Sequence, residues 1–189
     1  MRPLESNGTE ITVIDQQRLP HELVRVEIRT AAEAATAIRD MMVRGAPLIG
    51  ATAAYGMVFA LREDPSNAGV RSAHAALLDT RPTAINLRWA LDRVMNAVLS
   101  CDESKRAEHA LDVADAIVDE EAAMCAAIGN HGLPLIEEVH RRTGKPVNVL
   151  THCNAGWLAT FDYGTATAPV YLAKERGIPV HVWVDETRP

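Results

Sequence analysis

The spacing of apolar and polar residues changes once along the chain, and the change separates two kinds of predicted structure. Up to about residue 144, apolar residues mostly recur at helical spacing. Beyond residue 145, two short apolar runs rich in β-branched residues flank one helical segment, which is typical of a βαβ unit. We therefore predict an α/β protein with a mainly helical domain over residues 1–144, followed by a second domain whose first part is residues 145–189.

The first domain is expected to carry a small sheet and several helices. Residues 9–14 and 23–28 alternate as short strands. Thr30, followed three residues later by Glu33, predicts a capping box at the first helix, and Thr83 is expected to cap a later one. Six helical segments are predicted: 30–43, 48–61, 70–78, 84–99, 103–128 and 135–142. Three large apolar side chains are expected in the core: Met41, Met42 and Trp89.

The second domain is predicted to begin with one βαβ unit. Its strands are residues 147–152 and 179–184, its helix is 165–176, and the strands should be parallel. One such unit has two open edges and little core. We therefore expect the remainder of a doubly wound domain to lie outside these 189 residues.

The composition indicates a globular protein and argues against nucleic acid or a membrane as its partner. Hydrophobic residues make up 48% and charged residues 23%, as in globular proteins. The net charge of -6 and the pI of 5.6 argue against a nucleic-acid surface. Glycine and proline interrupt the uncharged stretch between Arg44 and Arg62, which favours a buried helix over a membrane span. Three cysteines form no disulfide framework and fit a reducing, cytoplasmic location.

Cys153 is the main candidate for chemistry. It follows a predicted parallel strand, and ligands bind at the carboxyl edge of such sheets. A thiol there can act as an acid, a base or a nucleophile, while a buried structural cysteine remains the alternative. His152 is expected to be a hydrogen-bonded structural histidine. Cys101 and Cys125 are interpreted as structural, and no cysteine–histidine spacing fits a zinc site.

Two arginines precede predicted helix starts. Arg44-Gly45-Ala46-Pro47 joins two helices, and Arg81-Pro82-Thr83 repeats the arrangement. Exposed N–H groups at a helix start attract anions, and a guanidinium adds charge and a fork of donors. Either segment alone also fits an ordinary turn, but together they favour a phosphorylated ligand.

These segments together resemble the S-methyl-5-thioribose-1-phosphate isomerase family, which is related to regulatory subunits of a translation-initiation nucleotide-exchange complex. The resemblance extends over essentially the whole chain. It rests on the order and spacing of five short motifs: Arg44-Gly45-Ala46-Pro47, Thr80-Arg81-Pro82-Thr83-Ala84, Leu150-Thr151-His152-Cys153-Asn154-Ala155-Gly156, Tyr163-Gly164-Thr165-Ala166 and Asp185-Glu186-Thr187-Arg188-Pro189.

The resemblance implies a Rossmann-like second domain and a cofactor-independent enzyme. That enzyme converts 5-methylthioribose 1-phosphate to 5-methylthioribulose 1-phosphate in methionine salvage. It implies that Arg44, Gly45, Ala46 and Arg81 bind the phosphorylated pentose and that Cys153 is catalytic. It also implies a homodimer of the complete protein, without nucleic acid or membrane as a partner.

The same resemblance implies that the family's catalytic aspartate lies beyond residue 189. We therefore expect the 189-residue chain to be inactive alone and a second chain to carry the C-terminal half. Two alternatives remain open. One is an isomerase of another 1-phosphorylated pentose, such as ribose 1,5-bisphosphate. The other is a non-catalytic regulatory relative.

Overall fold

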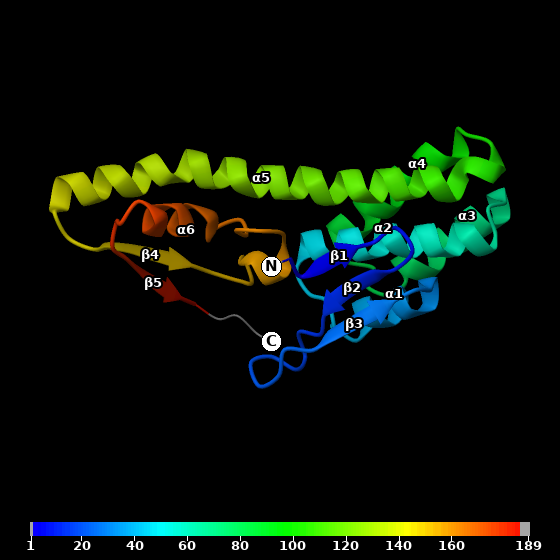
Figure 1. Cartoon of the computed structure of the whole chain (residues 1–189), viewed down its shortest axis with the longest axis horizontal. Coiled ribbons are helices and arrows are strands. Elements are labelled where there is room, and N and C mark those ends of the chain that lie inside the picture. The colour runs from blue at the N-terminus through cyan, green and yellow to red at the C-terminus, as the bar shows by residue number, and fades with distance from the viewer. Residues whose placement is uncertain (1, 186–189) are drawn as a thin grey trace. The chain divides into compact units, whose positions relative to one another are not determined.

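The computed structural model describes residues 2–185. Of the motif Asp185-Glu186-Thr187-Arg188-Pro189, only Asp185 is among the described residues. Figure 1 labels the helices and strands. In chain order they are β1 (Leu4–Ser6), β2 (Ile11–Ile14), β3 (Arg25–Ile28), α1 (Ala31–Arg39), α2 (Ala46–Glu63), α3 (Asn67–Leu78), α4 (Ile85–Leu99), α5 (Arg106–Thr143), β4 (Val147–Thr151), α6 (Ala168–Glu175) and β5 (Val180–Val184), with short 3-10 turns at Glu103–Lys105 and Trp157–Ala159.

The described chain packs into two compact units. One contains residues 3–119, and the other contains Arg2 with residues 120–185. Helix α5 therefore contributes its first part to one unit and its second part to the other. The predicted domain boundary near residues 144–145 stays a prediction. Within residues 2–185, no helix has the length and apolar character needed to cross a membrane.

The predicted small sheet is present in the first unit. Its strands run antiparallel in the order β1-β2-β3, and Val13 of the central strand pairs with Leu4 on one side and Val26 on the other. Ile11, Val13 and Ile14 are fully buried, so β2 anchors the sheet to the core. Strand β1 was not predicted, because only one of its three residues is apolar.

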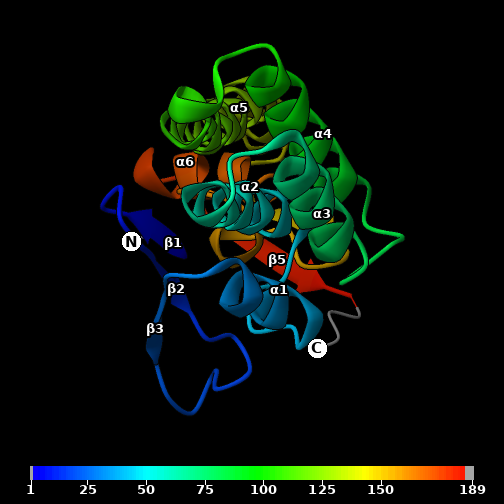
Figure 2. The same ribbon diagram turned by 90° about the vertical axis from the view of Figure 1, so that its right-hand side faces the viewer.

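The helices of this unit are built around α2. Figure 2 shows α1, α2, α3 and α4 grouped together, and α2 packs against each of the other three. Most of its side chains are buried because alanine and glycine make it apolar on every side. The predicted capping box is confirmed: the Glu33 N–H donates to Thr30 Oγ1, and the Thr30 N–H donates to Glu33 Oε2.

Several predicted details of this unit were wrong. Helix α1 ends at Arg39, because Met41 has a left-handed φ of 59° that no α-helix can contain. Met41 and Trp89 are 39% and 43% exposed rather than buried. Arg93 lies over the Trp89 ring at 5.6 Å, which covers an apolar face that the core leaves open.

Helix α5 is continuous, although the sequence predicted a break between residues 128 and 135. It runs for 38 residues with Pro134 inside it. A proline removes one helical hydrogen bond and usually interrupts a helix. Leu133 and Ile136 flank the proline and are 3% and 7% exposed in the core of the second unit. Their burial offsets the cost of the proline.

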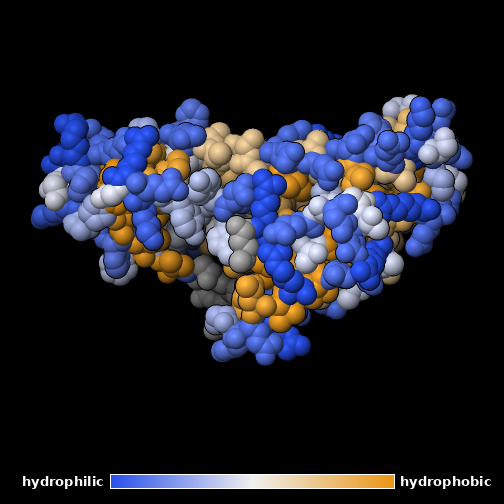
Figure 3. Space-filling view, in the orientation of Figure 1, coloured by the Kyte–Doolittle hydropathy of each residue, from blue (hydrophilic) through white to orange (hydrophobic). Residues whose placement is uncertain are grey.

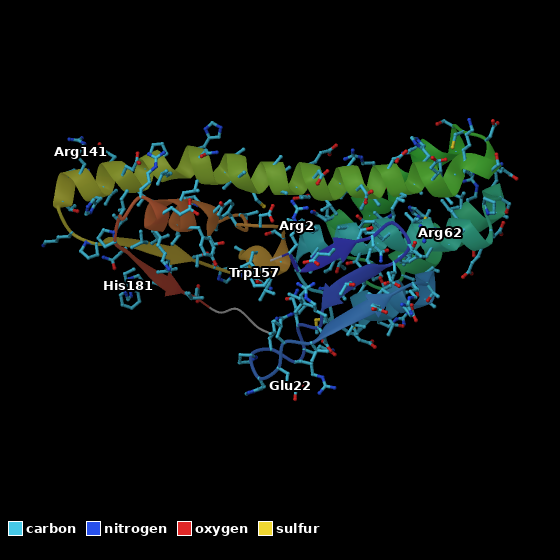
Figure 4. The ribbon with its side chains drawn as sticks, in the orientation of Figure 1. Arg2, Glu22, Arg62, Arg141, Trp157 and His181 are labelled. Carbon is cyan, nitrogen blue, oxygen red and sulfur yellow. The ribbon has the colours of Figure 1, made fainter. Side chains whose placement is uncertain are left out.

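The second unit contains the predicted parallel strand pair. Val147 pairs with Val180 and Thr151 with Val184. One face of the pair packs against α5 and α6 through an apolar cluster of Leu133, Ile136, Val147 and Ala173. The other face leaves Leu150 75% exposed, and Figure 3 shows apolar side chains at the surface over β4 and β5.

Candidate functional site

The start of α2 carries the first predicted anion-binding segment. Gly45 is the N-cap residue, and its φ of 98° is a conformation that glycine adopts without strain. Among the described residues, no side chain caps this helix, and Pro47 has no N–H of its own. The half-buried Arg44 directly precedes this uncapped start. The arrangement suits an anion because the N-terminus of a helix carries partial positive charge.

Arg81 lies in the turn between α3 and α4 and is half-buried. The Ala84 N–H donates to the Arg81 carbonyl oxygen over 3.0 Å, which closes the turn. The N-cap of α4 is Ala84, without a side-chain hydrogen bond. The prediction that Thr83 caps this helix was therefore wrong, and the start of α4 is uncapped like that of α2.

The two arginine-bearing helix starts lie near one crossing of α2 and α4. A Cβ atom built on Gly50 would lie 3.0 Å from the Asn86 carbonyl oxygen and 3.5 Å from the Ala90 Cβ. Gly50 and Asn86 belong to the first two turns of their helices. The fold thus brings together the first turns of two helices that lie far apart in the sequence, and each helix follows one of the arginine-bearing segments.

Cys153 occupies an exposed turn in the second unit. Strand β4 ends at Thr151, and Cys153 has a φ of 70°. Residues other than glycine rarely adopt this left-handed region, and such conformations gather at functional sites. The side-chain alternation of a strand therefore does not extend to His152 and Cys153. The exposed thiol differs from Cys125, which is fully buried, and from Cys101, whose Sγ donates to the Val98 carbonyl.

Hydrogen bonds from the segment before α6 hold the turn that carries Cys153. The Ala155 carbonyl oxygen accepts a hydrogen bond from the Thr165 N–H at 3.0 Å. It also accepts from the Thr165 hydroxyl over 3.4 Å and lies 3.4 Å from the Thr167 hydroxyl, which donates to the Tyr163 carbonyl oxygen at 2.7 Å. Gly164, with a φ of 79°, leaves the space that this contact needs. Ala155, Gly164 and Thr165 belong to the motifs of the resemblance, but no pattern in the sequence predicted these contacts.

His152 and Asp185 form a second feature at the ends of the strands. His152 Nδ1 lies 3.1 Å from Asp185 Oδ2, and the Asp185 N–H donates to the Thr151 carbonyl over 3.0 Å. Their side chains are 71% and 59% exposed. The parallel register places them side by side, because Thr151 pairs with Val184.

The predicted site residues divide between the two units. Arg44, Gly45, Ala46 and Arg81 lie in the unit of residues 3–119, and Cys153 lies in the other. Within residues 2–185, no three histidine, cysteine, aspartate or glutamate side chains are grouped so that they would hold a metal ion.

Solved structures with this fold include an isomerase and a translation factor subunit. The 5-methylthioribose 1-phosphate isomerase of Pyrococcus horikoshii superposes with a TM-score of 0.85 at 32% identity, over 100% of this chain and 53% of that one. The translation initiation factor eIF-2B subunit delta of A. fulgidus superposes with a TM-score of 0.81 at 35% identity, over 100% of this chain and 55% of that one.

Sequence comparison gives nearer relatives. The chain is 56% identical over 185 residues to the methylthioribose-1-phosphate isomerase of Methylorubrum populi, covering 98% of this chain and 51% of that protein. It is 54% identical over 188 residues to the enzyme of the same name from Sinorhizobium medicae, covering 98% and 52%. The chain thus spans about half the length of the curated relatives it matches. The profile of the Initiation factor 2 subunit family matches residues 42–189, and the chain belongs to this family.

Proposed function

We propose that this chain acts as part of an isomerase that converts 5-methylthioribose 1-phosphate to 5-methylthioribulose 1-phosphate. The observation that carries the proposal is Cys153, an exposed thiol in a left-handed turn at the carboxyl end of a parallel strand. A regulatory protein has no chemical need for a thiol held in this way. The 52–56% identity to proteins named methylthioribose-1-phosphate isomerase supports the same conclusion.

In this proposal the arginine-bearing segments bind the phosphate of the substrate. Arg44 and Arg81 supply charge and paired donors, and Gly45 and Ala46 supply backbone at an uncapped helix start. A fixed phosphate holds the sugar in one orientation, which lowers the entropy cost of the reaction. The proposal includes a cytoplasmic location, expected from the sparse cysteines, and a homodimeric complete enzyme, expected from the resemblance.

Cys153 acts at the reacting carbons in this proposal. Phosphorylation of the anomeric oxygen blocks simple opening of the sugar to an aldehyde, so the enzyme must assist ring opening. Hydrogen then moves from C2 to C1, either as a proton through an enolate-like species or as a hydride. The thiol and a carboxylate supplied by the rest of the enzyme would form the acid–base pair.

A chimera tests the proposal. Residues 1–189 are joined to the C-terminal half of the Methylorubrum populi isomerase, which replaces that enzyme's own first half; we call this protein the isomerase chimera. We expect it to convert 5-methylthioribose 1-phosphate and to convert ribose 1,5-bisphosphate poorly. The parent enzyme is the positive control. A folded chimera that converts neither sugar would refute the proposal.

The likeness to the translation factor subunit makes a non-catalytic role the second candidate. Its structure covers this whole chain at 35% identity. This alternative predicts that the isomerase chimera folds but turns over no 1-phosphorylated pentose, so the same assay separates the two candidates.

A further inference from the structure

The parallel strands bring together a histidine and a carboxylate beside Cys153. His152 and Asp185 are 33 positions apart in the sequence, yet their Nδ1 and Oδ2 atoms lie 3.1 Å apart. The hydrogen bond from the Asp185 N–H to the Thr151 carbonyl fixes the end of β5 against the end of β4. The pair therefore follows from the strand register, at the edge of the sheet where ligands bind.

The contact determines which nitrogen of His152 is available. A carboxylate accepts only, so in the neutral ring the hydrogen bond places the proton on Nδ1 and leaves the lone pair on Nε2. The His152 side chain is 71% exposed. An exposed contact of this kind contributes little to stability. Stabilising the strand pair is therefore a weak explanation for the His152–Asp185 contact. Orienting the imidazole so that Nε2 is available is a stronger explanation.

The proposed reaction requires proton transfers at oxygen as well as at carbon. The ring oxygen gains a proton when its bond to C1 breaks, and the C2 hydroxyl loses one when the C2 carbonyl forms. Both transfers are needed whether hydrogen moves from C2 to C1 as a proton or as a hydride. An imidazole accepts and returns protons near neutral pH, so a single histidine can serve both oxygens.

We propose that His152, oriented by Asp185, is a second proton-transfer residue of this site and acts on the sugar oxygens. The imidazolium gives its Nε2 proton to the ring oxygen as the ring opens, and Nε2 of the neutral ring then takes the proton of the C2 hydroxyl as the C2 carbonyl forms. The histidine ends protonated, as it began, and no oxidant or reductant is consumed. Asp185 stabilises the imidazolium and holds the neutral ring with Nε2 free to accept. This inference rests on the proposed isomerase function.

His152→Asn in the isomerase chimera is the primary test. The asparagine amide keeps a donor for Asp185 and removes only the ring with its Nε2. We expect kcat to fall by about 10²- to 10⁴-fold, with KM and melting temperature near those of the unsubstituted chimera. In a second variant, His152→Gly, added imidazole should restore part of the lost kcat. A histidine that only ties the strands together would not produce this rescue.

His181→Asn is the matched control. His181 is an exposed histidine on β5 that projects from the strand pair, and its ring contacts that of Trp183. Its substitution should leave kcat unchanged. A normal kcat in His152→Asn would overturn the inference, as would a loss of kcat in His152→Gly that imidazole does not relieve. If the unsubstituted chimera is itself inactive, the proposed function fails instead, so the two failures are distinguishable.

Discussion

A Cβ atom on Gly50 would lie 3.0 Å from the carbonyl oxygen of Asn86, so α2 and α4 approach each other at the level of their backbones. A larger residue at position 50 must move the first turn of α4, with the turn that holds Arg81. We expect Gly50→Leu to lower the free energy of unfolding by about 1–3 kcal/mol, the usual cost of overpacking. Denaturant unfolding of the chain measures this change.

The matched control is Ala75→Leu. Ala75 is exposed on α3, so a longer side chain there is not forced into the core. Its effect should stay within about 0.5 kcal/mol. If Gly50→Leu is equally harmless, the backbone contact between α2 and α4 is not required for stability.

The Cys153 turn depends on Gly164 in a similar way. A Cβ atom on Gly164 would lie 2.6 Å from both the Ala155 carbonyl oxygen and Thr167 Oγ1. Gly164→Ala should therefore cost about 2–5 kcal/mol, from the left-handed backbone and the clash together. It should also change the rate at which Cys153 reacts with iodoacetamide, because the Ala155 contact holds the turn.

Gly177→Ala is the control that separates the backbone strain expected in Gly164→Ala from the steric clash with Ala155. Gly177 has a similar φ of 73°, but a Cβ atom there would meet nothing within 4 Å. Only the backbone cost of about 1–2 kcal/mol is expected, with unchanged thiol reactivity. Equal effects of the two substitutions would show that the clash with Ala155 does not matter.

Features determined by local sequence were predictable. Thr30 and Glu33 lie three residues apart, and their side chains reach the backbone groups of the same helical turn, so the capping box could be predicted from spacing alone. The parallel strands followed from two runs of β-branched residues around a helical segment. Arg44 and Arg81 precede helix starts, and these positions were also predictable because local sequence marks where a helix begins.

Features that depend on long-range packing were not predictable. Pro134 indicates a helix end by itself, and only the burial of its neighbours keeps α5 continuous. The His152–Asp185 contact requires the register of β4 against β5, which no local pattern specifies. The left-handed conformation of Cys153 has no sequence signature, because it is imposed by the turn around it.

Glu121 gives a prediction about pH. Burial raises the pKa of the Glu121 carboxyl, and the neighbouring charge of Glu120 adds to the effect. The folded chain therefore holds this proton more tightly than the unfolded chain does. Stability is lost as the pH rises from the unfolded pKa, about 4.3, through the raised folded pKa. Glu121→Gln should raise the melting temperature at pH 7. The gain should vanish near pH 4; an equal gain at both values would contradict this reading.

Arg44 should determine affinity for the phosphate. Losing a charge-assisted hydrogen bond costs about 1.5–3 kcal/mol, so Arg44→Ala in the isomerase chimera should raise KM roughly 10- to 100-fold. Arg44→Lys keeps the charge but lacks the paired donors and should recover only part of the loss. Arg71→Ala, at an exposed position on α3, is the control. An unchanged KM in Arg44→Ala would remove this residue from the phosphate site.

Cys153→Ser tests the thiol directly. A hydroxyl is nearly the same size as a thiol but far less acidic, so it should transfer a proton poorly. In the isomerase chimera we expect kcat to fall by about 10²- to 10⁴-fold with substrate affinity and melting temperature retained. Cys101→Ser and Cys125→Ser are the controls, because Cys125 is buried in α5 and the Cys101 Sγ donates to the Val98 carbonyl oxygen. They should lower the melting temperature and leave kcat nearly normal. A Cys153→Ser variant that matched the parent kcat would exclude the thiol from the mechanism.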